Sequence, residues 1–141
     1  MERESFIGTW RLVSFEVRSV DGEVSYPHGE DAVGYIIYDA NGYMSVAVMA
    51  AGRPAFASDD FSGGSTEEKA AAFDSYISYC GRYEVRGDRI IHHVEVSLLP
   101  NWIGGVQERI LAFNGNRLSL STEPLLFGGK QQSAHLIWER A

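Results

Sequence analysis

The chain has 141 residues, 45% of them hydrophobic and 22% charged, which predicts one soluble globular domain, 1–141, with a substantial core. Its formal net charge of −7 disfavours nucleic acid and anionic membranes as partners, because both bind basic surfaces. No apolar run approaches the ~20 residues that span a bilayer. The N-terminal segment MERESFIGTW lacks the apolar stretch of a secretory signal, so we expect a cytoplasmic protein.

Strand patterns dominate the chain, and turn residues such as Asp21-Gly22 and Asn41-Gly42 separate them. The strands that we expect, in chain order, are Gly8–Val20, Val33–Tyr38, Tyr43–Met49, Tyr79–Arg86, Arg89–Ser97, Val106–Phe113, Arg117–Thr122 and Gln132–Arg140.

A single helix is expected at Ser65–Ser75, because Ser65 or Thr66 can cap it and Glu67 and Glu68 occupy its first turn. The preceding loop, Ala51–Gly64, is rich in glycine, proline, serine and aspartate. We expect loop and helix to form a lid over one end of the fold.

The hairpin Tyr79–Ser97 turns at Gly87-Asp88, which places Tyr83 opposite His92. Side chains alternate along a strand, so one face of this hairpin is predicted to point inward. That face carries Tyr79, Gly81, Tyr83, Val85, Ile90, His92, Val94 and Val96.

The hairpin around Asn114-Gly115-Asn116 is predicted to pair Phe113 with Asn116 and Leu111 with Leu118. Its more apolar face carries Gln107, Arg109, Leu111, Phe113, Leu118, Leu120 and Thr122. Gln107 and Arg109 are therefore expected to point inward.

Many consecutive strands joined by hairpin turns favour an antiparallel up-and-down β-barrel. Closure removes the exposed edges that so many strands would otherwise leave. A barrel of about eight strands can hold one small ligand.

The opening Gly8-Thr9-Trp10 resembles the Gly-x-Trp start of the calycin group, which includes the lipocalins. The segments GTWRLVSFE, DGEVSYPHGEDAVGYIIYDANGYMSV, YCGRYEV, IIHHVEVSLLPNW and GVQERI resemble the bacterial and fungal lipocalin-like domain proteins. This resemblance implies a lipocalin-like barrel in which Trp10 closes one end and Arg140 packs on it. It also implies a small-molecule site and a link to natural-product biosynthesis, since members of the group often accompany such pathways.

His92 is the first candidate catalytic residue, because a histidine facing a cavity can act as general acid or base. The alternative is a core histidine hydrogen-bonded to a tyrosine or to the backbone. Tyr83 and Tyr79 supply aromatic walls with hydroxyl groups, useful for ligand contact or only for packing. Trp102 follows the His92 strand and is placed to gate the entrance or to staple its loop.

Arg109 is the second candidate, since an inward guanidinium needs an anionic or multidentate acceptor. It could clamp a carboxylate, enolate or polarised carbonyl, or form an internal salt bridge to Glu16 or Glu95. Gln107 would add an amide beside it, or simply lie at the barrel mouth.

No metal or cofactor is expected, because the adjacent His92 and His93 point to opposite faces and no phosphate-binding loop is present. Two functions fit these residues. The first is a cofactor-independent cyclase, isomerase or dehydratase in which His92 moves a proton and Arg109 and the tyrosines stabilise an oxyanion. The second is a non-catalytic carrier of a small apolar or aromatic metabolite. We expect a monomer or a homodimer.

Overall fold

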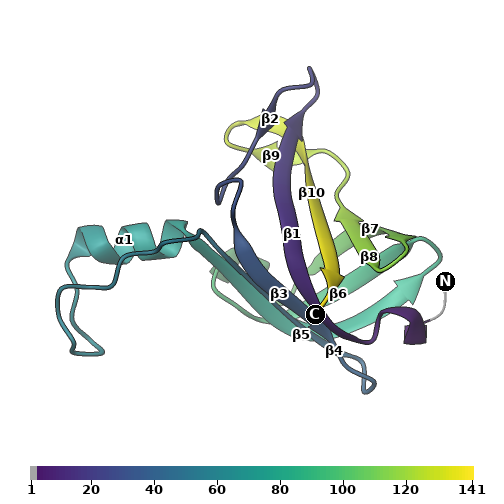
Figure 1. Ribbon diagram of the computed structural model, residues 1–141, viewed down its shortest axis with the longest axis horizontal. Coiled ribbons are helices and arrows are strands. Elements are labelled where there is room, and N and C mark those ends of the chain that lie inside the picture. The colour runs from purple at the N-terminus through teal and green to yellow at the C-terminus, as the bar shows by residue number, and fades with distance from the viewer. Residues whose placement is uncertain (1–2) are drawn as a thin grey trace.

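The computed structural model describes residues 3–141, and its chain folds into a closed antiparallel barrel with one helix outside it (Figure 1). The strands are β1 Gly8–Ser19, β2 Val24–Ser25, β3 Val33–Tyr38, β4 Tyr43–Met49, β5 Tyr76–Arg86, β6 Arg89–Ser97, β7 Val106–Asn114, β8 Arg117–Ser121, β9 Leu125–Phe127 and β10 Lys130–Arg140. The helices are α1 Thr66–Asp74 and two 3-10 turns, Arg3–Phe6 and Pro100–Trp102.

Barrel closure comes from the pairing of the first long strand with the last. The sheet runs β2-β1-β3-β4-β5-β6-β7-β8-β10-β9, and β1 also pairs with β10 along most of its length. Within residues 3–141, eight strands form the closed ring, and the short strands β2 and β9 flank it. The predicted up-and-down barrel of about eight strands with one helix is confirmed.

Alternation of buried and exposed residues sets the inner face of each strand. In β3, Gly34, Ile36 and Tyr38 are buried, while Tyr35 and Ile37 are exposed. The hairpin between β5 and β6 pairs Tyr83 with His92, as the Gly87-Asp88 turn predicts.

The predicted inner face is wrong at the far end of this hairpin, because a β-bulge lies between Cys80 and Gly81. Cys80 pairs with Val96 and Gly81 with Val94, so β6 carries one extra residue and its alternation reverses. Val96 is therefore 65% exposed instead of facing inward. Gly81 permits the close approach of the two strands, because a Cβ there would lie 1.9 Å from the carbonyl oxygen of His93.

The β7–β8 hairpin has the predicted inner face but a different register. Phe113 pairs with Leu118 and Leu111 with Leu120, around a two-residue turn at Gly115-Asn116. The predicted pairing of Phe113 with Asn116 is wrong by two residues. A shift of two preserves the side-chain alternation, so the inner face is unaffected.

Helix α1 protrudes from the barrel and does not cover an end of it, so the expected lid is not observed (Figure 1). Its start matches the prediction, since Ser65 and Glu68 form a reciprocal capping box. No residue of α1 is buried. Within the part of the chain that the structure describes, no helix is long and apolar enough to cross a membrane.

Candidate functional site

A cavity of about 710 Å³ lies within the barrel. Apolar side chains from most of the strands form its walls, including Phe15, Ile36, Val48, Leu120 and Leu136. Segments outside the barrel ring also line it: residues 27–28, 73–74, 98–99 and 125–128. This volume and this largely apolar lining are typical of pockets for small organic ligands.

Four polar side chains of the cavity lie on three neighbouring strands, β5, β6 and β7, and form what we call the polar wall. His28, Asp74 and Thr122 line the cavity from other segments. Tyr79, His92, Gln107 and Arg109 all line the cavity. His92 pairs directly with Gln107, and Ile90 pairs with Arg109. His92 and Arg109 are therefore diagonal neighbours on the same face of the sheet, at a Cα separation of about 7–8 Å.

His92 is 1% exposed and is hydrogen-bonded through both ring nitrogens. Its Nε2 lies 2.8 Å from the Tyr38 hydroxyl and its Nδ1 lies 2.7 Å from the Tyr79 hydroxyl. Burial, together with the nearby charge of Arg109, lowers the pKa of His92 to about 3. The imidazole is therefore neutral at ordinary pH, and it has one donor and one acceptor nitrogen.

Arg109 supplies positive charge to this wall. Its guanidinium donates to Oε1 of Gln107 and to the carbonyl of Glu108, each at 2.9 Å. Among the described residues, no carboxylate forms a salt bridge with it, and the alternative partner Glu16 is paired with Arg18. Burial raises the pKa of the Tyr79 hydroxyl, while the charge of Arg109 acts to lower it.

Trp102 lines the cavity from the 3-10 turn that follows β6. Its ring meets the ring of Tyr79 edge-on, with centroids 5.7 Å apart. Pro100 begins this turn and Trp102 also lines the cavity, so the loop brings an aromatic ring over the polar wall.

Two of the expected site residues, Tyr83 and Trp10, do not line the cavity. The Tyr83 hydroxyl donates to the carbonyl of Asp39 at 2.8 Å, which directs it away from the cavity that His92 lines. Trp10 is buried at the opposite end, where its indole N–H donates to the carbonyl of Phe6 at 2.9 Å. The guanidinium of Arg140 lies 4.0 Å from the centre of the Trp10 ring, in the arrangement that the family resemblance implies.

Sequence reasoning missed Tyr38, the second partner of His92. Its only available signal was its place at the end of the pattern Gly34, Ile36, Tyr38 on the buried face of β3. Sequence reasoning also left open which face of β10 is internal. Trp138 is 1% exposed and lines the cavity, whereas His135 is only partly buried.

The chemistry of this wall suits an oxygen-bearing ligand. Among the described residues, no group of three or more histidine, cysteine, aspartate or glutamate side chains is placed to hold a metal ion. The guanidinium and the tyrosine hydroxyl are donors that can meet a ligand oxygen, while the apolar walls bury its carbon skeleton.

Comparison with known proteins gives matches over most of the chain. A family model described as a lipocalin-like domain matches residues 7–141. The chain is 40% identical over 106 residues to the 4'-hydroxy-3'-methoxypropiophenone carrier protein of Aspergillus oryzae, a match that covers 69% of this chain and 96% of that protein.

Two solved structures also align along nearly the full length. A lipocalin-like protein from Bacteroides uniformis has 13% identity and a TM-score of 0.47, and the alignment covers 96% of this chain and 97% of that one. The wild-type fluorescent protein UnaG has 11% identity and a TM-score of 0.44, with 99% of this chain and 100% of that chain covered.

Proposed function

The chain belongs to the lipocalin-like domain family, and on that premise we propose that it binds and carries a small aromatic metabolite with an oxygen function. The cavity of about 710 Å³ is the observation that carries this proposal. Apolar walls would surround the ring and its alkyl groups. Arg109 and Tyr79 would meet the oxygen.

The relative from Aspergillus oryzae supports the ligand class. Its name describes a carrier of an aryl ketone that bears a hydroxyl and a methoxy group. Such a molecule is mostly apolar and carries several oxygens, and this composition suits the lining described above. We infer that the ligand here is an aryl ketone or a close analogue, formed or used in natural-product biosynthesis.

The geometry favours binding over proton transfer by His92. Both ring nitrogens are already hydrogen-bonded to tyrosine hydroxyls, and a pKa of about 3 makes the imidazole a weak base. A proton could pass between His92 and a ligand only through the Tyr79 hydroxyl, whose own pKa burial raises. A cofactor-independent cyclase or isomerase with His92 as the direct base is therefore the weaker hypothesis.

Calorimetric titration with propiophenone and 4'-hydroxypropiophenone tests the proposal. Ala134 is buried and lines the cavity, so the ring of Ala134→Phe should occupy part of the ligand space and weaken binding strongly. Ala112→Phe is the matched control, because Ala112 is exposed on the outer side of β7. Failure of the unmodified protein to bind any aryl ketone, or equal loss of binding in both variants, would contradict a ligand-carrying cavity.

Product analysis separates the carrier from the enzyme. After prolonged incubation with the protein, a bound ketone should be recovered unchanged by mass spectrometry. Steady conversion to a cyclised, isomerised or dehydrated product, lost in His92→Gln, would support the enzyme instead.

A further inference from the structure

A hydrogen-bonded chain of three side chains, Tyr38–His92–Tyr79, runs from the buried core to the cavity wall. His92 is bonded at 2.8 Å to Tyr38 and at 2.7 Å to Tyr79. Tyr79 lines the cavity, whereas Tyr38 is 1% exposed and does not. The direction in which protons point along this chain decides what the Tyr79 hydroxyl presents to a ligand.

We propose that Tyr38 and His92 fix the Tyr79 hydroxyl as a hydrogen-bond donor into the cavity, so that the cavity selects ligands with an acceptor oxygen, a carbonyl or an anion. This inference rests on the proposed ligand-binding function and specifies the chemistry that the site recognises. Tyr38 and His92 are positioning residues here, and Tyr79 is the residue that touches the ligand.

A neutral imidazole can complete the chain in two ways. With the proton on Nδ1, Tyr38 donates to Nε2, and Nδ1–H donates to the oxygen of Tyr79. With the proton on Nε2, both directions reverse: Nε2–H donates to Tyr38, and Tyr79 donates to Nδ1. Protonation at both nitrogens is disfavoured because burial depresses the pKa of His92.

The surroundings of Tyr38 distinguish these two arrangements. Among the described residues, the Tyr38 hydroxyl has no hydrogen-bond partner other than His92. If Nε2 carried the proton, the hydroxyl hydrogen of Tyr38 would be buried without an acceptor, which is costly. With the proton on Nδ1, Tyr38 donates its hydrogen to Nε2, and the hydrogen left over belongs to the Tyr79 hydroxyl, which lines the cavity.

The favoured arrangement leaves the hydroxyl hydrogen of Tyr79 unused by the protein. Its oxygen accepts from Nδ1–H, and no other partner of this hydroxyl is found in residues 3–141. Because Tyr79 lines the cavity, an acceptor on the ligand can take this hydrogen.

Two neighbouring groups point to the same ligand chemistry. Arg109 lines the same wall and only donates hydrogen bonds. The indole N–H of Trp138, another lining residue, is buried without a partner among the described residues. A carbonyl or ionised oxygen can accept from such donors. An alcohol in the same place also brings a hydrogen, which neither ring nitrogen of His92 can accept because one carries a proton and the other accepts from Tyr38.

Nitrogen NMR of the histidine-labelled protein tests the arrangement directly and without ligand. We expect the His92 ring to show a protonated Nδ1 and an unprotonated Nε2 in long-range proton–nitrogen spectra at neutral pH. A protonated Nε2 with a bare Nδ1 would overturn the inference while leaving ligand binding intact, so the two failures are distinguishable.

Matched ligands test the consequence for recognition. Tyr79→Phe should weaken the binding of propiophenone about fivefold, the effect of one neutral hydrogen bond, and leave propylbenzene unchanged. Tyr83→Phe is the control, because it also removes a tyrosine hydroxyl near His92, but one that donates to Asp39. An equal loss for both ligands, or none for the ketone, would refute the donor role. Absence of binding by either ligand to the unmodified protein would refute the proposed function.

Discussion

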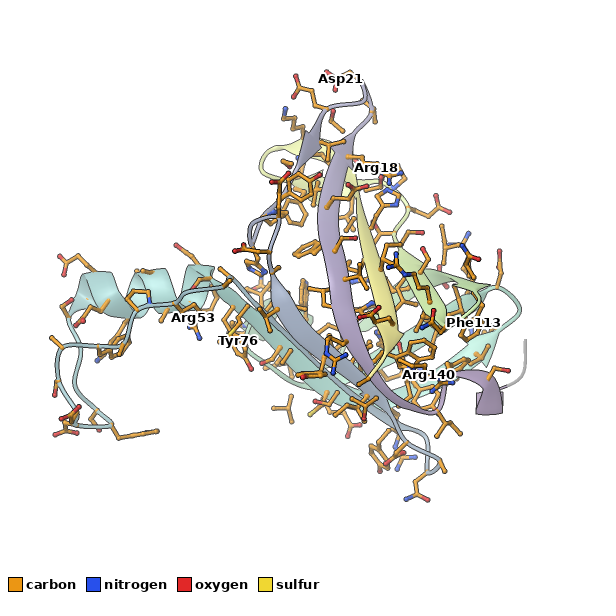
Figure 2. The ribbon with its side chains drawn as sticks, viewed as in Figure 1. Arg18, Asp21, Arg53, Tyr76, Phe113 and Arg140 are labelled. Atoms are coloured by element: carbon orange, nitrogen blue, oxygen red, sulfur yellow. The ribbon has the colours of Figure 1, made fainter. Side chains whose placement is uncertain are left out.

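At the end of the barrel beside the N-terminal turn, aromatic rings fill the interior, whereas the cavity lies toward the other end. Figure 2 shows Phe113 and Arg140 at the filled end, and Tyr76 at the base of α1 on the cavity side. The centroid of the Phe6 ring lies 5.3 Å from that of Tyr38, 5.9 Å from that of Tyr83 and 6.2 Å from that of Phe113.

The same strands thus serve two purposes along their length. Tyr38 and His92 lie at the boundary, where the packed aromatic cluster meets the polar wall. The filled end holds the boundary residues in place, and the cavity end presents the groups that they orient. Stability and affinity should therefore respond to different substitutions.

Trp10→Ala should give the largest effect on stability, a loss of about 3–5 kcal/mol in the free energy of unfolding. The residue is 1% exposed, and its ring packs against Phe113 and against Arg140. Urea unfolding measures this change, and calorimetry at low temperature measures affinity in the folded fraction. A loss of binding free energy as large as the loss of stability would show that the two ends of the barrel do not act separately. Trp10→Phe should reduce both stability and affinity less than Trp10→Ala does.

Acidification should destabilise the fold through His92. Its pKa is about 3 in the folded protein and 6.5 in the unfolded chain, so the unfolded state binds more protons between these values. The contribution of the neutral ring to stability is complete above pH 6.5 and is lost as the pH falls toward 3. At pH 4.5 the loss amounts to about 2–3 kcal/mol in the free energy of unfolding.

Unfolding free energies of the unmodified protein and of His92→Gln, compared from pH 8 to 4.5, isolate this contribution. The difference between the two should shrink as the pH falls. A constant difference would show that the His92 ring has the same pKa in the folded and unfolded states. Ring NMR titration gives an independent check if the variant is too unstable.

Arg109→Gln should weaken the binding of an aryl ketone with an ionised phenol by roughly 10- to 100-fold, the effect of a charge-assisted hydrogen bond. Stability should change little, because no described carboxylate is paired with this guanidinium. Arg89→Gln is the matched control, since Arg89 forms ion pairs outside the cavity with Glu123 and Glu108. Equal affinity of the unmodified protein and both variants for the ketone would show that Arg109 does not contact the ligand.

Ser65→Ala should have the smallest effect on the whole protein. It removes one half of the capping box, which costs the helix about 1 kcal/mol. Since α1 has no buried residue, its amide hydrogens should exchange about fivefold faster, with no change in global unfolding. Ser62→Ala in the preceding loop is the control. A marked drop in the unfolding midpoint would show that α1 supports the barrel.

Local patterns predicted most of the fold. The Gly87-Asp88 turn and period-two alternation gave the correct register around Tyr83 and His92. The prediction failed at Val96 because a bulge reverses the alternation, and only Gly81 marked that place. The turn at Gly115-Asn116 was misplaced because glycine and asparagine fit more than one hairpin turn.

The candidate site depended on contacts that the sequence does not encode locally. Whether His92 and Arg109 meet depends on the β6–β7 register, across a connection that contains a 3-10 turn. Tyr38 reaches His92 from β3, a strand that is not hydrogen-bonded to β6. Alternation could place each side chain inside, but barrel closure decides which inward side chains touch.

The protruding arm is built as an insertion whose ends meet. Met49 pairs with Tyr76, and the N–H of Ala50 donates to the carbonyl of Ser75 at 2.9 Å. Residues 51–74 therefore form a module that the chain enters and leaves at one point between two paired strands. Such a module can be shortened, lengthened or exchanged without breaking the β4–β5 ladder. Since Phe73 and Asp74 border the cavity, changes at the base of this module would reshape that border and leave the polar wall intact.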